Sequence, residues 1–179
     1  MKTVLVIAVL VTSLATGGNA FAVSHGGRKV ENIQPIQPSE LIVVLSESAD
    51  MKNLEILLQK LNDPDPFVRV EAVQALGEIQ KEPALASVCD CLADENIYVR
   101  AYAAEALGKI GQVDISLTLS RLLPALDDPS PYVRAMMVAA LGELQDERAA
   151  ASIRQLLHDE EESVRRMAAW ALRNIENSQ

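Results

Sequence analysis

The sequence predicts an all-α fold, an α-solenoid of about four helix pairs with a short leading helix. Two observations carry this prediction. One phrase recurs four times along the chain, with its arginines 31, 34 and 31 residues apart, and each copy contains two stretches with the apolar spacing of a helix. A period of this size with two helices in it is typical of stacked helical arrays.

The recurring phrase reads Leu, any residue, Asp, five further residues, and Arg. A Val stands before each Arg, and Ala and Leu follow the Arg by six and seven residues. The Asp and Arg of the four copies are Asp63 and Arg69, Asp94 and Arg100, Asp128 and Arg134, and Asp159 and Arg165.

Residues 1–22 are predicted to be a signal peptide. Lys2 supplies a positive start, residues 3–15 are mainly apolar, and Ala20 and Ala22 are small residues at the positions that a signal peptidase reads. We expect cleavage after Ala22 and an exported bacterial protein, periplasmic or secreted. No later stretch reaches the ~20 apolar residues that span a bilayer, so no membrane contact is expected after signal removal. A retained N-terminal anchor is the competing interpretation.

Residues 23–38 are predicted to be a flexible linker. They contain Gly26, Gly27, Pro35 and Pro38 among scattered polar residues, without a sustained apolar period. The repeat domain is therefore expected at 39–179, and its leading helix near 40–46.

The charge of the chain argues against a nucleic-acid partner. The formal net charge is -9, and loss of Lys2 with the signal peptide makes it more negative by one. Binding to a phosphate backbone depends on Lys and Arg contacts. Aromatic residues make up only 3% of the chain, as expected of an array that packs Ala and Leu instead of a wide core.

Each repeat is expected to hold a first (A) and a second (B) helix. The predicted pairs are 50–61 with 66–80, 83–93 with 97–110, 114–126 with 131–145, and 147–158 with 163–176. Asp65, Asn96 and Ser130 precede three B helices as N-cap residues, and Pro66 and Pro131 stand at favoured first helical positions. The last B helix is expected to begin more loosely, with Glu161 at the cap and Ser163 as a substitute.

One face of each B helix is predicted to be the core. In the first repeat it consists of Val68, Ala72, Leu76 and Ile79, and in the second of Val99, Ala103, Leu107 and Ile110. The glycines that follow the repeated Leu, Gly77, Gly108 and Gly142, are expected to let neighbouring helices approach closely. Arg173 replaces this Gly in the fourth repeat.

The combination of Asp, Val-Arg and Ala-Leu-Gly resembles HEAT repeats, particularly the HEAT-like repeats of phycobilin lyases, over residues 50–176. The resemblance implies that the repeated Asp and Arg form a structural ladder along the inter-helix turns, each Arg bridging its own and the adjacent repeat. Arg suits this role because its planar fork contacts several acceptors. A functional array of the same eight residues is the alternative.

No catalytic residue, metal ligand or cofactor site is predicted. His25 and His158 lie far apart in the chain. Deoxyhypusine hydroxylase, an enzyme of similar architecture, places His-Glu pairs directly after Val-Arg to hold two irons. The corresponding pairs here are Val70 and Glu71, Ala101 and Tyr102, Ala135 and Met136, and Arg166 and Met167. One carboxylate and no His remain, so the sequence argues against that activity.

Cys89 and Cys91 are predicted to be reduced thiols in a helix interface. Their spacing of two on a helix points them about 200° apart around its axis, which makes a disulfide between them difficult. A redox or metal-binding pair is the alternative, since exported proteins favour disulfides.

The resemblance also implies that the B helices line the concave, partner-binding side. The expected contact residues stand two and five positions after the repeated Arg and become more apolar toward the C-terminus: Glu71, Tyr102, Glu105, Met136, Met167 and Trp170. Tyr, Trp and Met are enriched in interface centres. The alternative is that Met136, Met167 and Trp170 pack only against neighbouring helices.

These features predict an exported, non-enzymatic scaffold that binds a partner protein or peptide on its concave face. The alternative is an accessory subunit of a lyase-type or other enzyme complex, which presents a substrate protein to chemistry performed elsewhere.

Overall fold

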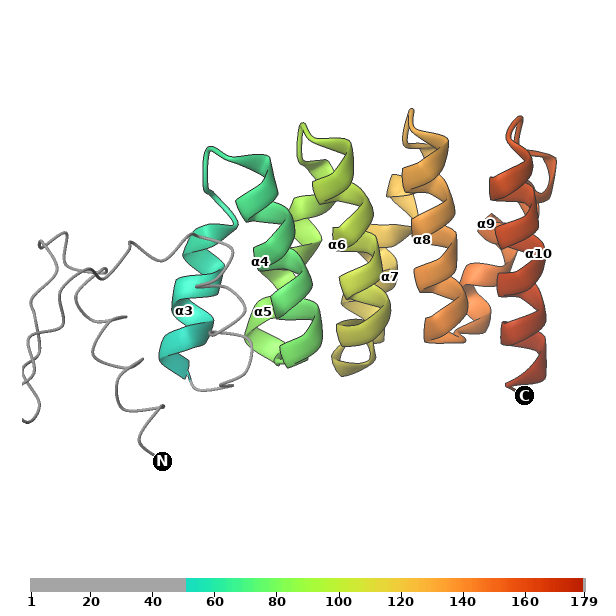
Figure 1. Ribbon diagram of the computed structural model, residues 1–179. Helices are drawn as coiled ribbons and strands as arrows, with labels where there is room; N and C mark the ends of the chain where they lie inside the picture. The colour runs from blue at the N-terminus through green and yellow to red at the C-terminus, as the bar shows by residue number, and fades with distance from the viewer. Residues whose placement is uncertain (1–50, 179) are drawn as a thin grey trace, which may run out of the picture. The chain divides into compact units, whose positions relative to one another are not determined.

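The computed structural model describes residues 51–178, which form α-helices and 3-10 turns without a strand. The predicted signal peptide, linker and leading helix lie outside these residues. The α-helices, coloured in chain order in Figure 1, are α3 (Met51–Lys60), α4 (Pro66–Ile79), α5 (Glu82–Asp90), α6 (Ile97–Ile110), α7 (Ile115–Leu122), α8 (Pro131–Leu144), α9 (Ala150–Gln155) and α10 (Glu162–Asn177).

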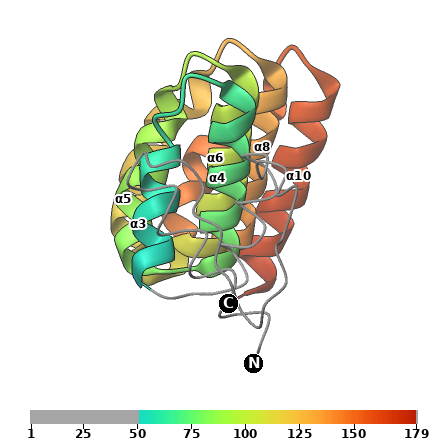
Figure 2. The same ribbon diagram turned by 60° about the vertical axis from the view of Figure 1, so that its left-hand side comes forward.

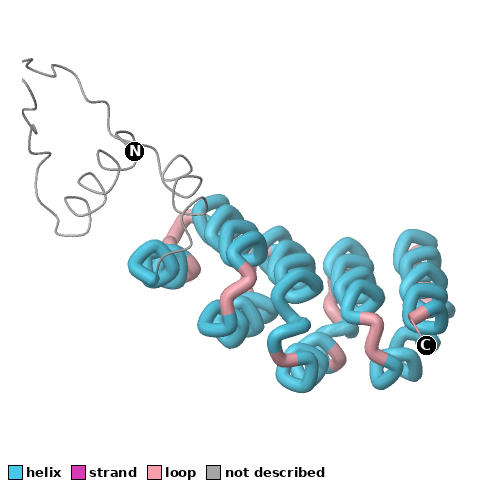
Figure 3. Tube along the Cα trace, turned by 90° about the horizontal axis from the view of Figure 1, so that it is seen from below, coloured by secondary structure: helices cyan, strands magenta, loops and turns pink. Residues whose placement is uncertain are grey.

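The helices stand in two rows, which Figure 3 shows along the helix axes. The B helices α4, α6, α8 and α10 pack side by side in one row, and the A helices α3, α5, α7 and α9 form the other. Figure 2 shows the same rows from the side of α3. Residues 51–178 therefore form an all-α solenoid of four helix pairs, as the sequence predicts.

Three of the A helices, α5, α7 and α9, are shorter than predicted because they end in 3-10 turns. These turns are Cys91–Ala93 after α5, Pro124–Asp127 after α7 and Leu156–His158 after α9, and a further turn, Glu147–Ala149, leads into α9. Pro124 lacks a backbone N–H and therefore interrupts the α-helical hydrogen bonds of the third A helix. The three turns that follow α5, α7 and α9 lead directly to a repeated Asp: Asp94, Asp128 and Asp159.

The core lies between the two rows and consists mainly of Leu, Val and Ala. Of the predicted core face, Val68, Ala72 and Leu76 are buried, as is the whole set in the second repeat, whereas Ile79 is half-buried at the end of α4. A Cβ on Gly142 would lie 2.8 Å from the Cβ of Ala171, so this Gly permits the close approach of α8 and α10.

Two of the four predicted N-caps make side-chain cap hydrogen bonds. Asp65 accepts the Phe67 N–H at 2.9 Å, and Asn96 accepts the Tyr98 N–H at 2.9 Å. The prediction for Ser130 was wrong in one respect: this residue precedes α8 but its side chain makes no cap bond, and Pro131 fixes the helix start instead. Glu161 also makes none, and Ser163 lies inside α10, so it is not a substitute cap.

The connections from B to A helices are of two kinds. Gln80 and Gln145 adopt left-handed backbone conformations, with φ of 51° and 55°, after α4 and α8. The connection after α6 is instead a 3-10 turn, Gly111–Val113, followed by the N-cap Asp114. This longer connection accounts for most of the extra residues in the 34-residue spacing.

Candidate functional site

The repeated Asp and Arg lie at the turns between the A and B helices. Each Asp accepts a hydrogen bond from the backbone N–H two residues ahead, as Asp94 does from Asn96 at 2.8 Å. Each Arg donates from Nη1 to the carbonyl oxygen of the Asp in its own repeat, at 2.9 Å for Arg69, Arg100 and Arg134 and 2.7 Å for Arg165. These bonds hold each turn against the first part of its B helix.

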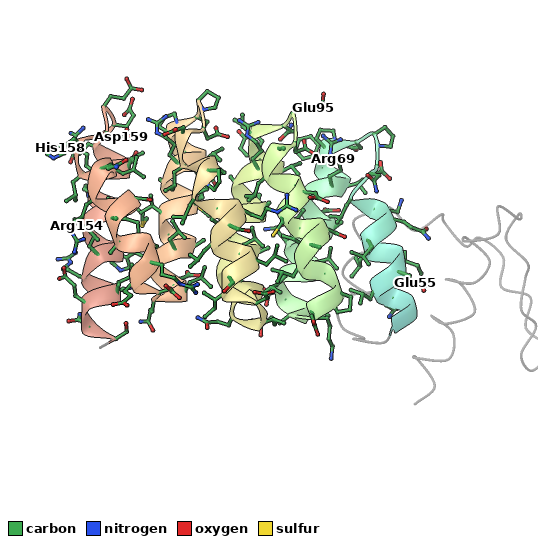
Figure 4. All side chains as sticks on the ribbon, turned by 180° about the vertical axis from the view of Figure 1, so that it is seen from behind. Glu55, Arg69, Glu95, Arg154, His158 and Asp159 are labelled. Carbon is green, nitrogen blue, oxygen red and sulfur yellow. The ribbon has the colours of Figure 1, made fainter. Side chains whose placement is uncertain are left out.

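The same arginines connect successive repeats. Arg69 donates from Nε and Nη2 to Asp94, both at 2.8 Å, and Arg134 does so to Asp159 at the same distances. Arg100 binds Asp128 in the same forked manner, at 2.6 and 3.1 Å. Figure 4 shows Arg69 and Asp159 along one edge of the array. The contacts of a ladder are therefore present between all four repeats.

Electrostatics favour the charged forms within the ladder. The hydrogen bond from Arg134 lowers the pKa of Asp159, and the Glu161 N–H adds to this effect against the opposing influence of burial. The bond to Asp159 in turn raises the pKa of Arg134. Because Nη1, Nη2 and Nε of the three bridging arginines all have acceptors within the protein, the ladder offers a partner few free donors.

The predicted contact residues lie on the outward face of the B helices, away from the A row. Glu71 lies on α4, Tyr102 and Glu105 on α6, Met136 on α8, and Met167 and Trp170 on α10. All six are half-buried. Their role in partner binding stays a prediction.

Trp170 illustrates why these side chains are only partly covered. A Cβ on Gly142 would lie 2.7 Å from Cζ3 of Trp170, so the indole packs over this Gly of the preceding B helix. The residue as a whole is half-buried. The Trp170 side chain thus packs between helices and is also partly exposed.

A second set of aromatic side chains was missed by the sequence reasoning. Phe67, Tyr98 and Tyr132 are 73%, 52% and 44% exposed and begin successive B helices. The Tyr98 and Tyr132 rings meet edge to face with centroids 6.5 Å apart. The available signal was their position, two residues before the repeated Arg in three copies. We call these three residues the aromatic row.

The aromatic row shares a helix face with the predicted contact residues. Counted from the repeated Arg, the aromatic row stands at position −2, and the other positions on this face are +2, +5 and +9. Successive positions are four, three and four residues apart, which places them on one side of a helix. The ninth position holds Glu78, Lys109, Glu143 and Asn174. Lys109 pairs with Glu78 at 2.6 Å and with Glu105 at 3.1 Å, so Glu105 is already engaged in an ion pair.

The two cysteines are free thiols with buried side chains. Burial raises the pKa of Cys89 to about 11 and that of Cys91 to about 12, and the Cys91 thiol donates to the Ser87 carbonyl oxygen at 3.4 Å. Both thiols are therefore protonated at neutral pH and poor nucleophiles.

Two shallow pockets lie elsewhere on the described residues. One of about 460 Å³ is lined by Asp128, Arg134 and Asp159 and belongs to the ladder turns. The other, of about 380 Å³, lies between α9 and α10 beside Arg154, Leu172 and Ile175. Within residues 51–178, no three His, Cys, Asp or Glu side chains are grouped to hold a metal ion. No helix of this part is long and apolar enough to cross a membrane.

Comparison with known proteins identifies the kind of helical repeat. A family model described as HEAT repeats matches residues 41–118 and 119–179. No curated protein sequence matches the chain. Among solved structures, the complex of CpcE and CpcF of phycocyanin lyase from Nostoc sp. PCC7120 is similar, with a TM-score of 0.65, 20% identity, and coverage of 73% of this chain and 86% of that one.

Two further structures share the fold. Human deoxyhypusine hydroxylase in complex with glycerol matches with a TM-score of 0.62 and 23% identity over 93% of this chain, which spans 53% of the hydroxylase chain. An engineered protein matches with a TM-score of 0.56 and 20% identity, over 78% of this chain and 69% of its own. At these identities the likeness concerns the fold.

Proposed function

The chain belongs to the HEAT-repeat family, and from this premise we propose that it is an exported, non-enzymatic scaffold. Its partner is a protein or peptide, which binds the outward face of the B helices, the side that is concave in the family. The residues on this face determine which side chains a partner must carry.

The distribution of aromatic residues is the observation that carries this proposal. Within residues 51–178, the aromatic side chains are Phe67, Tyr98, Tyr102, Tyr132 and Trp170, and all lie on B helices at positions that share the outward face. None of the five is buried. Aromatic side chains ordinarily supply much of a core, so their placement on one accessible face supports partner binding there.

The methionines extend the same face. Met136 on α8 and Met167, three residues before Trp170 on α10, are half-buried. Their flexible thioether chains adapt to irregular apolar surfaces. The face thus becomes more apolar from α4, which carries Glu71, to α10, and a partner is expected to place its apolar side chains toward α10.

The first experiment is affinity capture from the exported fraction, followed by titration of the recovered partner. Trp170→Ala combined with Met136→Ala is expected to weaken binding at least about tenfold. Tyr98→Ala is a second variant, because this residue is 52% exposed and loss of its ring does not open the core. Arg121→Ala, an exposed residue on α7 in the A row, is the matched control. Unchanged affinity in both face variants would reject this surface.

Export is tested separately. We expect the signal peptide at 1–22 to direct a fused reporter enzyme out of the cytoplasm, and the exported protein to begin at Val23. N-terminal sequencing of the exported chain measures the cleavage point. A chain that keeps residues 1–22 and sediments with membranes would favour the retained anchor.

An accessory subunit of an enzyme complex is the second candidate function. The similarity to a lyase complex of two subunits supports it, as does a surface suited to presenting a protein substrate. Absorption spectra of the purified protein and of its captured complex separate the two functions. A bound pigment or cofactor in the complex favours the accessory role, whereas a bare scaffold absorbs only through its aromatic residues.

A further inference from the structure

Arg165, the last arginine of the ladder, lacks the carboxylate that its three counterparts bind. Its Nη1 donates to the carbonyl oxygens of Asp159 and Glu160 in its own turn, both at 2.7 Å. Nη1 of Arg134 makes the equivalent pair of bonds in the preceding repeat, so the two guanidinium groups are held alike. Within residues 51–178, Nε and Nη2 of Arg165 make no hydrogen bond or ion pair. This fork therefore faces the place where the Asp of a following repeat would stand.

The opposite end of the ladder is closed by the chain itself. At Asp63, the first ladder residue, Lys60 of the same repeat takes the place of an arginine and donates to Oδ2 at 3.0 Å. The described part of the chain thus supplies a counter-charge for the first member of the ladder but none for the last. The Arg165 fork is held in position by its own turn and has the geometry that binds a carboxylate through two hydrogen bonds.

Other unpaired cations lie in the same repeat. Each arginine up to Arg148 forms an ion pair with a carboxylate: Arg69, Arg100, Arg121, Arg134 and Arg148. In the described part of the chain, the arginines that follow form none: Arg154, Arg165, Arg166 and Arg173. Glu161 and Glu162 stand one turn before two of them, yet no ion pair joins these residues. Figure 4 shows Arg154 at the α9 and α10 end of the array.

Two of these arginines lie on the side of α10 that faces away from α8. Arg173 takes the position of the repeated Gly, and in the other three repeats that Gly contacts an Ala of the next B helix. Arg166 is two helical turns before Arg173 and therefore lies on the same side. Both are exposed. A fifth B helix could not approach as closely over Arg173, so this end suits an acidic segment better than a further repeat.

We propose that the Nε and Nη2 fork of Arg165 binds an aspartate or glutamate side chain of a partner protein, where the Asp of a following repeat would stand. Arg166 and Arg173 lie about 10 Å apart along α10, so they attract further acidic side chains of the same segment and not the carboxylate in the fork. The evidence for the ligand is internal: three equivalent forks in the chain each bind an Asp carboxylate.

The probe is a labelled peptide in which aspartate alternates with serine. Its matched control has asparagine, which keeps the shape of aspartate without its charge. At low ionic strength, the full chain is expected to bind the aspartate peptide at least about tenfold more tightly than the asparagine peptide. Fluorescence anisotropy measures both affinities. Equal binding of the two peptides would overturn the proposal.

Variants locate the binding site on the protein. Arg165→Lys keeps the charge but not the fork, and it is expected to weaken the aspartate peptide several-fold. Arg173→Gln is expected to weaken it as well, and its side chain makes no hydrogen bond within residues 51–178 whose loss would disturb the fold. Lys81→Gln removes an equal charge from an exposed position before α5 and is the matched control. Native affinity in Arg165→Lys, or equal losses in Arg173→Gln and Lys81→Gln, would overturn the proposal.

Two further measurements separate other ligands from an acidic protein segment. Tighter binding of a single-stranded DNA of matched charge would assign the arginines to phosphate groups. Self-association in sedimentation that Arg165→Lys abolishes would identify a second copy of this chain as the ligand. Either result would overturn the proposal. The site is separate from the outward face of the B helices, so Tyr98→Ala is expected to leave the aspartate peptide unaffected, and the two surfaces can fail independently.

Discussion

Arg134 and Asp159 lie 25 residues apart in the chain, yet they meet through two parallel hydrogen bonds of 2.8 Å. The same carboxylate accepts the N–H of Glu161, which directly precedes the last B helix. One Asp therefore joins two repeats and orders its own turn. Removing either partner leaves a mostly buried charge without its counterpart, and this determines the expected behaviour of the ladder.

Arg100→Ala is expected to destabilise the protein by about 3 kcal/mol or more, because it leaves Asp128, with a side chain only 7% exposed, without its cation. Urea denaturation measures the loss. Arg121→Ala is the control, since its contact with Asp90 is 3.7 Å long and exposed, and pairs of this kind contribute about 0–1 kcal/mol. We expect Arg100→Ala to lower partner affinity less than it lowers stability. A variant with unchanged melting and lost binding would show that the ladder binds the partner.

The ladder also predicts a dependence of stability on acid. The pKa of Asp159 is lowered in the folded state from its ordinary value of 3.8, first by the bond from Arg134. The contribution of the Asp159 carboxylate to folding stability is therefore complete above pH 3.8. It is lost as the pH falls below 3.8 and through the pKa of the folded state. Asp159→Asn should be clearly less stable than the native protein at neutral pH, and the difference should shrink in strong acid. Urea titrations at both pH values measure it, with Glu55→Gln as control. A constant difference would contradict this linkage.

Gly142→Ala tests the close approach of α8 and α10. The new Cβ would lie 2.7 Å from Trp170 Cζ3 and 2.9 Å from Ala171 Cα, so the helices must separate, at a cost of about 1–3 kcal/mol. The better helix propensity of Ala offsets about 0.5–1 kcal/mol of this.

Gly77→Ala is the matched control, because its Cβ would meet the Ala106 Cβ at 3.0 Å and Ala106 Cα at 3.2 Å, which requires less movement. Thermal melting compares the two variants. Emission from Trp170, the chain's only Trp, should change in Gly142→Ala alone. If both variants melt alike, packing at Trp170 is looser than described.

The thiols are expected to react slowly in the folded protein. Burial raises the pKa values of Cys89 and Cys91 to about 11 and about 12, so little thiolate forms at pH 8. Ellman's reagent should titrate two thiols in denaturant and far fewer without it. A preparation with no titratable thiol in denaturant would indicate a disulfide.

Much of the fold could be predicted from the sequence because each repeated position has a single structural role. Val99, Ala103 and Leu107 recur at core spacing and are buried. The irregular parts were less predictable. Pro124 indicates a break, but the 3-10 form of the A helix ends depends on the turn that each must reach. Likewise, Ser130 is a good N-cap by type, whereas its actual bonds depend on the turn held by Asp128.

The interaction surface was predicted only in part for a related reason. Phe67, Tyr98 and Tyr132 precede the Arg by two residues, next to a buried Val, and apolar side chains beside a core position are easily assigned to the core. Their exposure depends on the angle of each B helix against its neighbours. The Glu143 side chain likewise lies over Gly108 because α6 packs on α8. The spacing of residues in the sequence does not indicate this contact.

The unequal spacing of the repeats shows where the array tolerates changes in length. Arg100 and Asp128 are 28 residues apart, whereas the other bridging pairs are 25 apart, yet all three pairs form the same fork. The turn Gly111–Val113 absorbs most of the difference at the opposite end of the helices. That edge is therefore suited to an engineered loop or epitope tag, while the Asp-Arg edge sets the alignment of the repeats and admits no such insertion.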